Sequence, residues 1–105
     1  GFIQNYDQLK KKGVDTIACV SVNDHFVMGA WAKDQGAGDK IAMIADGNGD
    51  FTRAVGLTLD GSGFGLGERS QRYAMIVDDG TVKQLNVEKG GAFEVSSAEA
   101  ILGAL

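Results

Sequence analysis

The chain contains few residues of the types that usually carry catalysis, with one cysteine, one histidine and no proline among 105 residues. The single thiol, Cys19, would be a nucleophile only if a helix N-terminus or a nearby cation lowered its pKa. It lies instead in an apolar run, between Ala18 and Val20, where burial raises the pKa of a thiol. We therefore interpret Cys19 as a packing residue and not as a catalytic one.

The histidine and the serines give no complete catalytic site either. His25 follows Asp24 in the first turn of an expected helix, where we expect it to be exposed. With one histidine and one cysteine the chain lacks the ligands of a zinc site, and we expect neither a metal nor a cofactor. Ser62 lies in Gly-Ser-Gly-Phe-Gly, which differs from the G-x-S-x-G motif of serine hydrolases.

Two glycine-rich segments resemble ligand-binding loops but lack residues or the structural context that those loops require. Residues 46–50 fit the first three ligand positions of an EF-hand, yet Phe51 replaces the required Gly and Leu57 the required Glu. We predict a turn there, followed by a short helix over residues 51–55. The glycines of residues 60–67 do not open a helix after a strand, so we expect a flexible loop near an interface or an active-site rim.

Arg72 is the remaining candidate for chemistry. It begins an apolar segment over residues 72–77, close to Glu68 and Arg69. A guanidinium group can stabilise negative charge that develops on oxygen or sulfur. Taken alone, this pattern favours an ordinary surface arginine, and Arg69 is the nearest competitor for a catalytic role.

The elements that would position these residues alternate between strands and helices, which is typical of an α/β fold. An apolar strand over residues 15–22, able to be buried on both faces, runs into the helix-capping pair Asn23-Asp24. The other expected elements are a helix with an apolar stripe from Phe2 to Leu9 and a Gly13 cap, a helix ending near residues 36–38, a strand over 41–45, hairpin strands over 72–77 and 81–87 around the turn 78–80, and a last helix to Leu105 opened by the capping box Ser96-x-x-Glu99.

Composition narrows the class of protein. The length favours one domain over residues 1–105, and the net charge of −4 disfavours nucleic acid or an anionic membrane as a partner. No apolar run is long enough to cross a bilayer. A single cysteine cannot form an internal disulfide, so we expect a reducing compartment and a cytoplasmic location.

Several motifs together resemble the type II (peroxiredoxin-five) class of peroxiredoxins, in the order in which that family has them. They are Ala18-Cys19-Val20-Ser21-Val22-Asn23-Asp24, Phe26-Val27-Met28, Ala30-Trp31, and the segments 41–46, 72–80 and 85–88. The resemblance implies a thioredoxin-like fold. It also implies a thiol peroxidase that reduces hydrogen peroxide and alkyl hydroperoxides with glutathione, glutaredoxin or thioredoxin, and that forms a homodimer.

The resemblance assigns one catalytic residue to this chain, Arg72, which matches the active-site arginine of the family. The family's Pro-x-x-x-Thr-x-x-Cys motif is absent, and we expect this nucleophile and the central strand to precede Gly1, so that the fold is incomplete at its N-terminus. A resolving cysteine would fall near Val95-Ser96, and there is none. Without the central strand we expect the chain alone to fold poorly or to pair its strand edges with another chain.

A second interpretation belongs to a different class of protein. The chain could be a redox-inactive interaction module with a thioredoxin-like fold that dimerises through the helix of Trp31 and the glycine-rich loop. That interpretation predicts association without peroxidase activity, whereas the first predicts turnover once the upstream cysteine is present.

Overall fold

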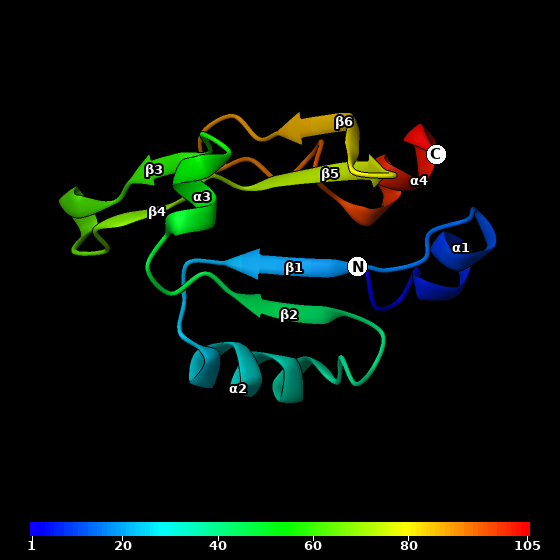
Figure 1. Ribbon diagram of the computed structural model, residues 1–105, viewed down its shortest axis with the longest axis horizontal. Helices are drawn as coiled ribbons and strands as arrows, with labels where there is room; N and C mark the ends of the chain where they lie inside the picture. The colour runs from blue at the N-terminus through cyan, green and yellow to red at the C-terminus, as the bar shows by residue number, and fades with distance from the viewer. The chain divides into compact units, whose positions relative to one another are not determined.

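The computed structural model describes residues 1–105, which divide into two compact units. One unit comprises Thr16–Gln71, and the other combines Gly1–Asp15 with Arg72–Leu105. The two units are described separately below (Figure 1). The expected single domain over residues 1–105 stays a prediction.

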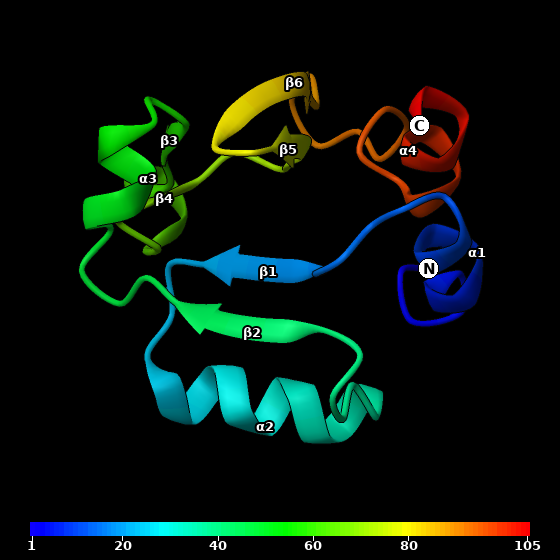
Figure 2. The same ribbon diagram turned by 45° about the vertical axis from the view of Figure 1, so that its right-hand side comes forward.

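The unit Thr16–Gln71 combines a strand–helix–strand motif with a short hairpin. Its elements in chain order are β1 (Ala18–Ser21), α2 (His25–Gln35), β2 (Ala42–Ala45), α3 (Asp50–Ala54), β3 (Thr58–Asp60), the 3₁₀ turn η1 (Ser62–Phe64) and β4 (Glu68–Ser70). Strands β1 and β2 pair in parallel, with Cys19 opposite Met43, and α2 lies along this pair in Figure 1 and Figure 2. The connection through α2 is the crossover that parallel strands require.

Helix α2 begins and ends where the sequence predicts. The Asp24 side chain accepts a hydrogen bond of 2.8 Å from the backbone N–H of Val27, which satisfies a donor of the first turn. Gly36 adopts a left-handed conformation with φ +66° and ends the helix. Met28 is the buried residue of α2. Strand β1 is half-buried, with Ala18 exposed, so the burial on both faces expected for this strand is not observed.

The glycine-rich region connects the two strands of a short hairpin that the sequence does not predict. The loop expected over residues 60–67 is found over residues 61–67, where it connects β3 to β4, and these two strands pair antiparallel, with Thr58 opposite Ser70. The backbone N–H of Gly61 donates to the carbonyl of Gly67 at 2.7 Å and closes the connection. Strands of three residues are too short to show an alternating apolar pattern, which is why the pairing was not predicted.

The second unit is a hairpin with two helices. It contains α1 (Tyr6–Lys11), β5 (Tyr73–Asp78), β6 (Thr81–Val87) and α4 (Ala98–Ala104). The turn between β5 and β6 has positive φ at Asp79 (50°) and Gly80 (76°), as a two-residue type I′ turn requires. Helix α4 contacts β5, and the connection between β6 and α4 is visible in Figure 2. The two-residue turn joins β5 to β6, so the predicted hairpin is confirmed.

Both helices of this unit begin later than predicted. The apolar stripe from Phe2 predicted the first helix, but residues 2–5 form turns and α1 starts at Tyr6, with Gly13 following its end at φ +96°. Helix α4 is capped by Ser97, whose hydroxyl accepts from the N–H of Ala100 at 3.1 Å, so the predicted cap at Ser96 was wrong by one residue. Ser96 is buried and binds another partner, described below. None of the helices is long and apolar enough to cross a membrane.

Candidate active site

Arg72 lies immediately before β5. The strand was predicted to begin at Arg72 but begins one residue later, at Tyr73. Its carbonyl oxygen accepts a hydrogen bond of 2.9 Å from the backbone N–H of Glu88, just past the end of β6. The Arg72 guanidinium carbon lies over the ring of Phe93, 5.0 Å from its centroid. The backbone of Arg72 is thus fixed by the hairpin, while its side chain is exposed and packs against an aromatic ring.

The segment 88–96 that faces Arg72 is organised by one buried carboxylate. Oxygen Oε2 of Glu88 accepts three hydrogen bonds, from the backbone N–H of Glu94 (2.8 Å), the backbone N–H of Ser96 (2.9 Å) and the hydroxyl of Ser96 (2.6 Å). Only 6% of Glu88 is exposed. The Asn86 side chain adds a hydrogen bond of 2.9 Å to the carbonyl of Val95. We call this segment the Glu88 loop.

The electrostatics of Glu88 favour its ionised form. Burial by itself would raise the pKa of this carboxyl, but the hydrogen bonds from Ser96 and from the backbone of residues 94–96 outweigh it and lower the pKa to about 2. Glu88 is therefore a carboxylate throughout the neutral pH range. It needs no cationic partner, because backbone and hydroxyl donors supply the stabilisation.

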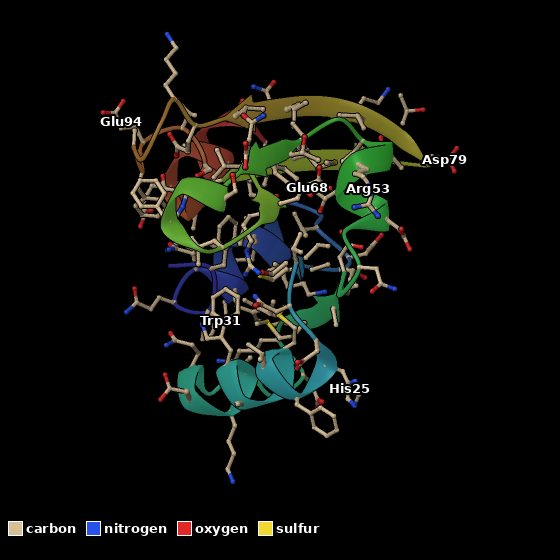
Figure 3. All side chains as sticks on the ribbon, turned by 90° about the vertical axis from the view of Figure 1, so that its left-hand side faces the viewer. His25, Trp31, Arg53, Glu68, Asp79 and Glu94 are labelled. Carbon is tan, nitrogen blue, oxygen red and sulfur yellow. The ribbon has the colours of Figure 1, made fainter.

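The guanidinium of Arg72 has no hydrogen-bonded side-chain partner, whereas those of Arg53 and Arg69 do. Arg53 donates hydrogen bonds to Asp50 and Glu68, each at 2.7 Å, and to the carbonyl of Asn48, and Figure 3 shows Arg53 and Glu68 side by side. Its pKa is raised by the hydrogen bonds to Glu68 and Asp50. Arg53 is thus a structural link between α3 and β4.

Arg69, the expected competitor of Arg72, is also committed to a structural contact. Its Nη2 donates to Oδ1 of Asn23 at 3.0 Å, and Asn23 in turn donates to the hydroxyl of Ser21 at 2.7 Å. Arg69 therefore ties β4 to the end of β1 within the unit Thr16–Gln71. Of the three arginines, Arg72 is the one whose N–H donors have neither a carboxylate nor an amide partner.

The remaining candidate residues take structural places. Cys19 is half-buried on β1, and burial raises the pKa of its thiol, as the sequence predicted. His25 is exposed in the first turn of α2, with its ring 4.0 Å from that of Phe26, and Figure 3 shows it pointing outward. The backbone N–H of Ser62, at the start of η1, donates to the carboxylate of Asp60 at the end of β3, and the single histidine of the chain, His25, lies on α2.

Residues 46–49 lead through a turn into α3, as predicted, and α3 begins at Asp50, one residue before the predicted helix over residues 51–55. The Asp46 carboxylate accepts from the N–H of Phe51 (3.1 Å), the N–H of Thr52 (2.9 Å) and the hydroxyl of Thr52 (2.6 Å). These bonds, led by the Thr52 hydroxyl, lower the pKa of Asp46 although burial opposes them. No group of three acidic, histidine or cysteine side chains is placed to hold a metal ion.

Sequence reasoning missed Glu88, Phe93 and Ser96 as neighbours of the candidate site. Glu88 was noted only as part of a family motif, and a glutamate after an apolar strand is indistinguishable from a surface residue until its partners are known. The adjacent Gly90-Gly91 pair signalled a tight turn after β6, which is the one local sign that the chain folds back here.

Comparison with known proteins identifies the class of chain. Residues 2–102 match the Redoxin family. The chain belongs to the redoxin family. Two similar relatives of this redoxin chain are peroxiredoxins. Peroxiredoxin-2E, chloroplastic, from Arabidopsis thaliana is 54% identical over 107 residues, which cover 100% of the chain and 46% of the relative. Reduced Prx3 from Vibrio vulnificus, crystallised in complex with hydrogen peroxide, is 61% identical with a TM-score of 0.95, covering 100% of the chain and 67% of that structure.

A more distant solved structure supports the same fold for the redoxin chain. Peroxiredoxin 5 from Alvinella pompejana is 41% identical with a TM-score of 0.87, covering 98% of the chain and 64% of that structure. The expected thioredoxin-like fold is thereby confirmed, with the chain corresponding to part of it. The redoxin chain spans about half the length of the relative Peroxiredoxin-2E.

Proposed function

We propose that this chain belongs to a type II peroxiredoxin, a thiol peroxidase that reduces hydrogen peroxide and alkyl hydroperoxides. The observation that carries the proposal is the arrangement of Arg72. Its backbone carbonyl accepts a hydrogen bond from Glu88, and its guanidinium has no carboxylate partner. In a chain that is similar over its whole length to peroxiredoxins, such a group is suited to bind peroxide oxygens. Metal and cofactor chemistry plays no part in the proposed reaction.

The proposed nucleophile is a cysteine outside residues 1–105, because Cys19 has a raised pKa and sits within a strand. Its thiolate attacks the distal oxygen of the hydroperoxide, the O–O bond breaks, and the sulfur becomes a sulfenic acid. The alkoxide or hydroxide that leaves takes up a proton and departs as alcohol or water. Arg72 donates hydrogen bonds to the peroxide oxygens and stabilises the charge that moves from sulfur to the leaving oxygen.

We propose that recycling uses thiols from another molecule. Cys19 is the only cysteine in the chain, and the position near Val95-Ser96 holds none. A first external thiol attacks the sulfenic sulfur, releases water and forms a mixed disulfide. A second external thiol then attacks the external sulfur of that mixed disulfide, so the two external sulfurs leave as a disulfide and the protein thiolate is restored. Glutathione, glutaredoxin or thioredoxin are the proposed reductants, and the reducing chemistry suits a cytoplasmic location.

The proposed assembly is a homodimer formed through α2 and the connection 61–67. Large apolar side chains are exposed on both, with 75% of Phe26, 42% of Trp31 and 87% of Phe64 accessible. Exposed apolar side chains gathered in one unit favour contact with another protein surface. The same feature supports the alternative, a redox-inactive interaction module, which predicts the dimer without turnover.

Peroxide consumption separates the two functions. The protein expressed from its complete reading frame should consume hydrogen peroxide with at least one of the three reductants, and Arg72→Ala should lower kcat/KM by roughly 10²-fold or more, as loss of one transition-state donor does. Arg69→Ala is the matched control, because it removes a guanidinium three residues away and should leave turnover intact. A dimer without turnover under all three reductants would establish the interaction module instead.

A further inference from the structure

We infer that Phe93 is a positioning residue for Arg72: its ring holds the guanidinium in place while leaving the N–H donors available for peroxide. The inference rests on the proposed function and adds a residue to the same site. The guanidinium carbon lies 5.0 Å from the ring centroid, within the range of about 6 Å over which a cation is attracted to an aromatic face.

The chemical advantage of a ring over a carboxylate follows from where the donors point. All five N–H bonds of a guanidinium lie in its plane, so a carboxylate partner consumes donors, whereas an aromatic partner under the group consumes none. Arg53 shows the first arrangement in this chain, with Asp50 and Glu68 occupying its donors. Arg72 shows the second, and its donors stay free for an oxygen ligand.

The Glu88 loop explains why the ring is in the right place. The backbone N–H of Glu88 binds the carbonyl of Arg72 at 2.9 Å, and its carboxylate binds the N–H of Glu94, the residue after Phe93, at 2.8 Å. One residue therefore fixes the backbone on both sides of the Arg72–Phe93 contact. The bonds from Ser96 complete the anchor.

The exposure of Phe93 argues that the ring is not there for the core. Its accessible fraction is 61%, so it gains little from burial, and its removal should leave the fold intact. Phe93→Leu keeps an apolar side chain and removes the aromatic face, whereas Phe93→Trp and Phe93→Tyr keep a face. Phe51→Leu, on α3, is the matched control, because Phe51 is also exposed and has no guanidinium over its ring.

A spectroscopic test measures the contact directly. In the protein expressed from its complete reading frame, the side-chain protons of Arg72 should show an upfield ring-current shift in NMR spectra. The shift should vanish in Phe93→Leu, persist in Phe93→Trp and Phe93→Tyr, and be unaffected by Phe51→Leu. Arg72 resonances that are unchanged by Phe93→Leu would overturn the inference.

Steady-state kinetics test whether the contact between Phe93 and Arg72 supports peroxide turnover. Phe93→Leu should lower kcat/KM by about two- to fivefold, the size expected of an exposed cation–π contact, with recovery in Phe93→Trp and full activity in Phe51→Leu. The loss should be equal for hydrogen peroxide and for cumene hydroperoxide, because Arg72 binds the oxygens that both share. A loss confined to cumene hydroperoxide would overturn the inference and make Phe93 a wall of the substrate site. If the wild-type protein is active and Phe93→Leu is fully active, the role of Phe93 is overturned and the proposed function stands. If the wild-type protein is inactive, both the role of Phe93 and the proposed function are overturned.

Discussion

At the scale of single residues, the two buried carboxylates of the chain are held by neutral donors. Asp46 binds the first turn of α3, and Glu88 binds its own loop, each through two backbone N–H groups and one hydroxyl. Burial opposes ionisation in both, yet the pKa of each is lowered. Hydrogen bonds to these ionised carboxylates stabilise the fold at neutral pH, and this stabilisation is lost in acid, when the carboxylates are protonated.

The first prediction concerns Glu88 and acid stability. Its folded pKa of about 2 lies below the ordinary 4.5, so the stabilisation is complete above about pH 4.5 and is lost as the pH falls toward 2. Glu88→Gln should reduce the free energy of unfolding at pH 7 and flatten its decline between pH 4.5 and pH 2. Denaturant unfolding of both proteins at pH 7 and pH 3 measures this, and parallel losses in the two would contradict it.

The second prediction concerns the reactivity of Cys19. Since burial raises the pKa of its thiol and hinders access, iodoacetamide at pH 7.5 should alkylate Cys19 more slowly than it alkylates free cysteine. Unfolding in guanidinium chloride should remove the difference. Mass spectrometry of timed samples follows the adduct, and faster labelling in the folded protein would point to an activated thiol.

At the scale of elements, α4 shows how a distant residue selects between two equivalent caps. Ser96 and Ser97 are both good N-cap residues, and Ser96 was predicted because Glu99 completes a capping box with it. In the structure Glu88, eight residues earlier, takes the hydroxyl and N–H of Ser96. The helix therefore starts one residue later, with Ser97 as its cap.

The third prediction separates the two serines. Ser97→Ala should lower the free energy of unfolding by about 1 kcal/mol at pH 7 and pH 3 alike, because it removes a cap that does not titrate. Ser96→Ala should also destabilise at pH 7 but weaken the acid dependence, because it removes a bond to the Glu88 carboxylate. Identical pH profiles for the two variants would show that Ser96 does not support Glu88.

Elements set by local chemistry could be predicted from the sequence, and those set by distant partners could not. Asp24 and Gly36 bound α2 through contacts within a few residues, and Asp79-Gly80 supplies the positive φ of the hairpin turn. The β3–β4 pair depends on Thr58 meeting Ser70, and no local pattern encodes that register. In the site, Arg72 followed from a family resemblance, whereas its neighbours Phe93 and Glu88 are brought to it by the return of the chain after β6.

At the scale of the whole molecule, every sheet has two strands: β1 pairs with β2, β3 with β4, and β5 with β6. Two-stranded sheets are marginal in water, and edge strands with unpaired backbone groups favour pairing with other chains.

The fourth prediction concerns the 105 residues expressed alone. They should self-associate in sedimentation experiments or unfold without a sharp thermal transition. The protein from the complete reading frame is the control and should unfold cooperatively. A cooperative, monomeric transition of the 105-residue chain at low concentration would contradict this expectation.

The most direct test of the proposed chemistry is to locate the oxidised sulfur. The protein from the complete reading frame is treated with one equivalent of hydrogen peroxide in the presence of dimedone, and the adduct is mapped by mass spectrometry. We predict a sulfenic-acid adduct on a cysteine outside residues 1–105, formed more slowly in Arg72→Ala, with Cys19 unmodified. An adduct on Cys19, or none on any cysteine, would contradict a peroxidase in which an outside thiolate reacts beside Arg72.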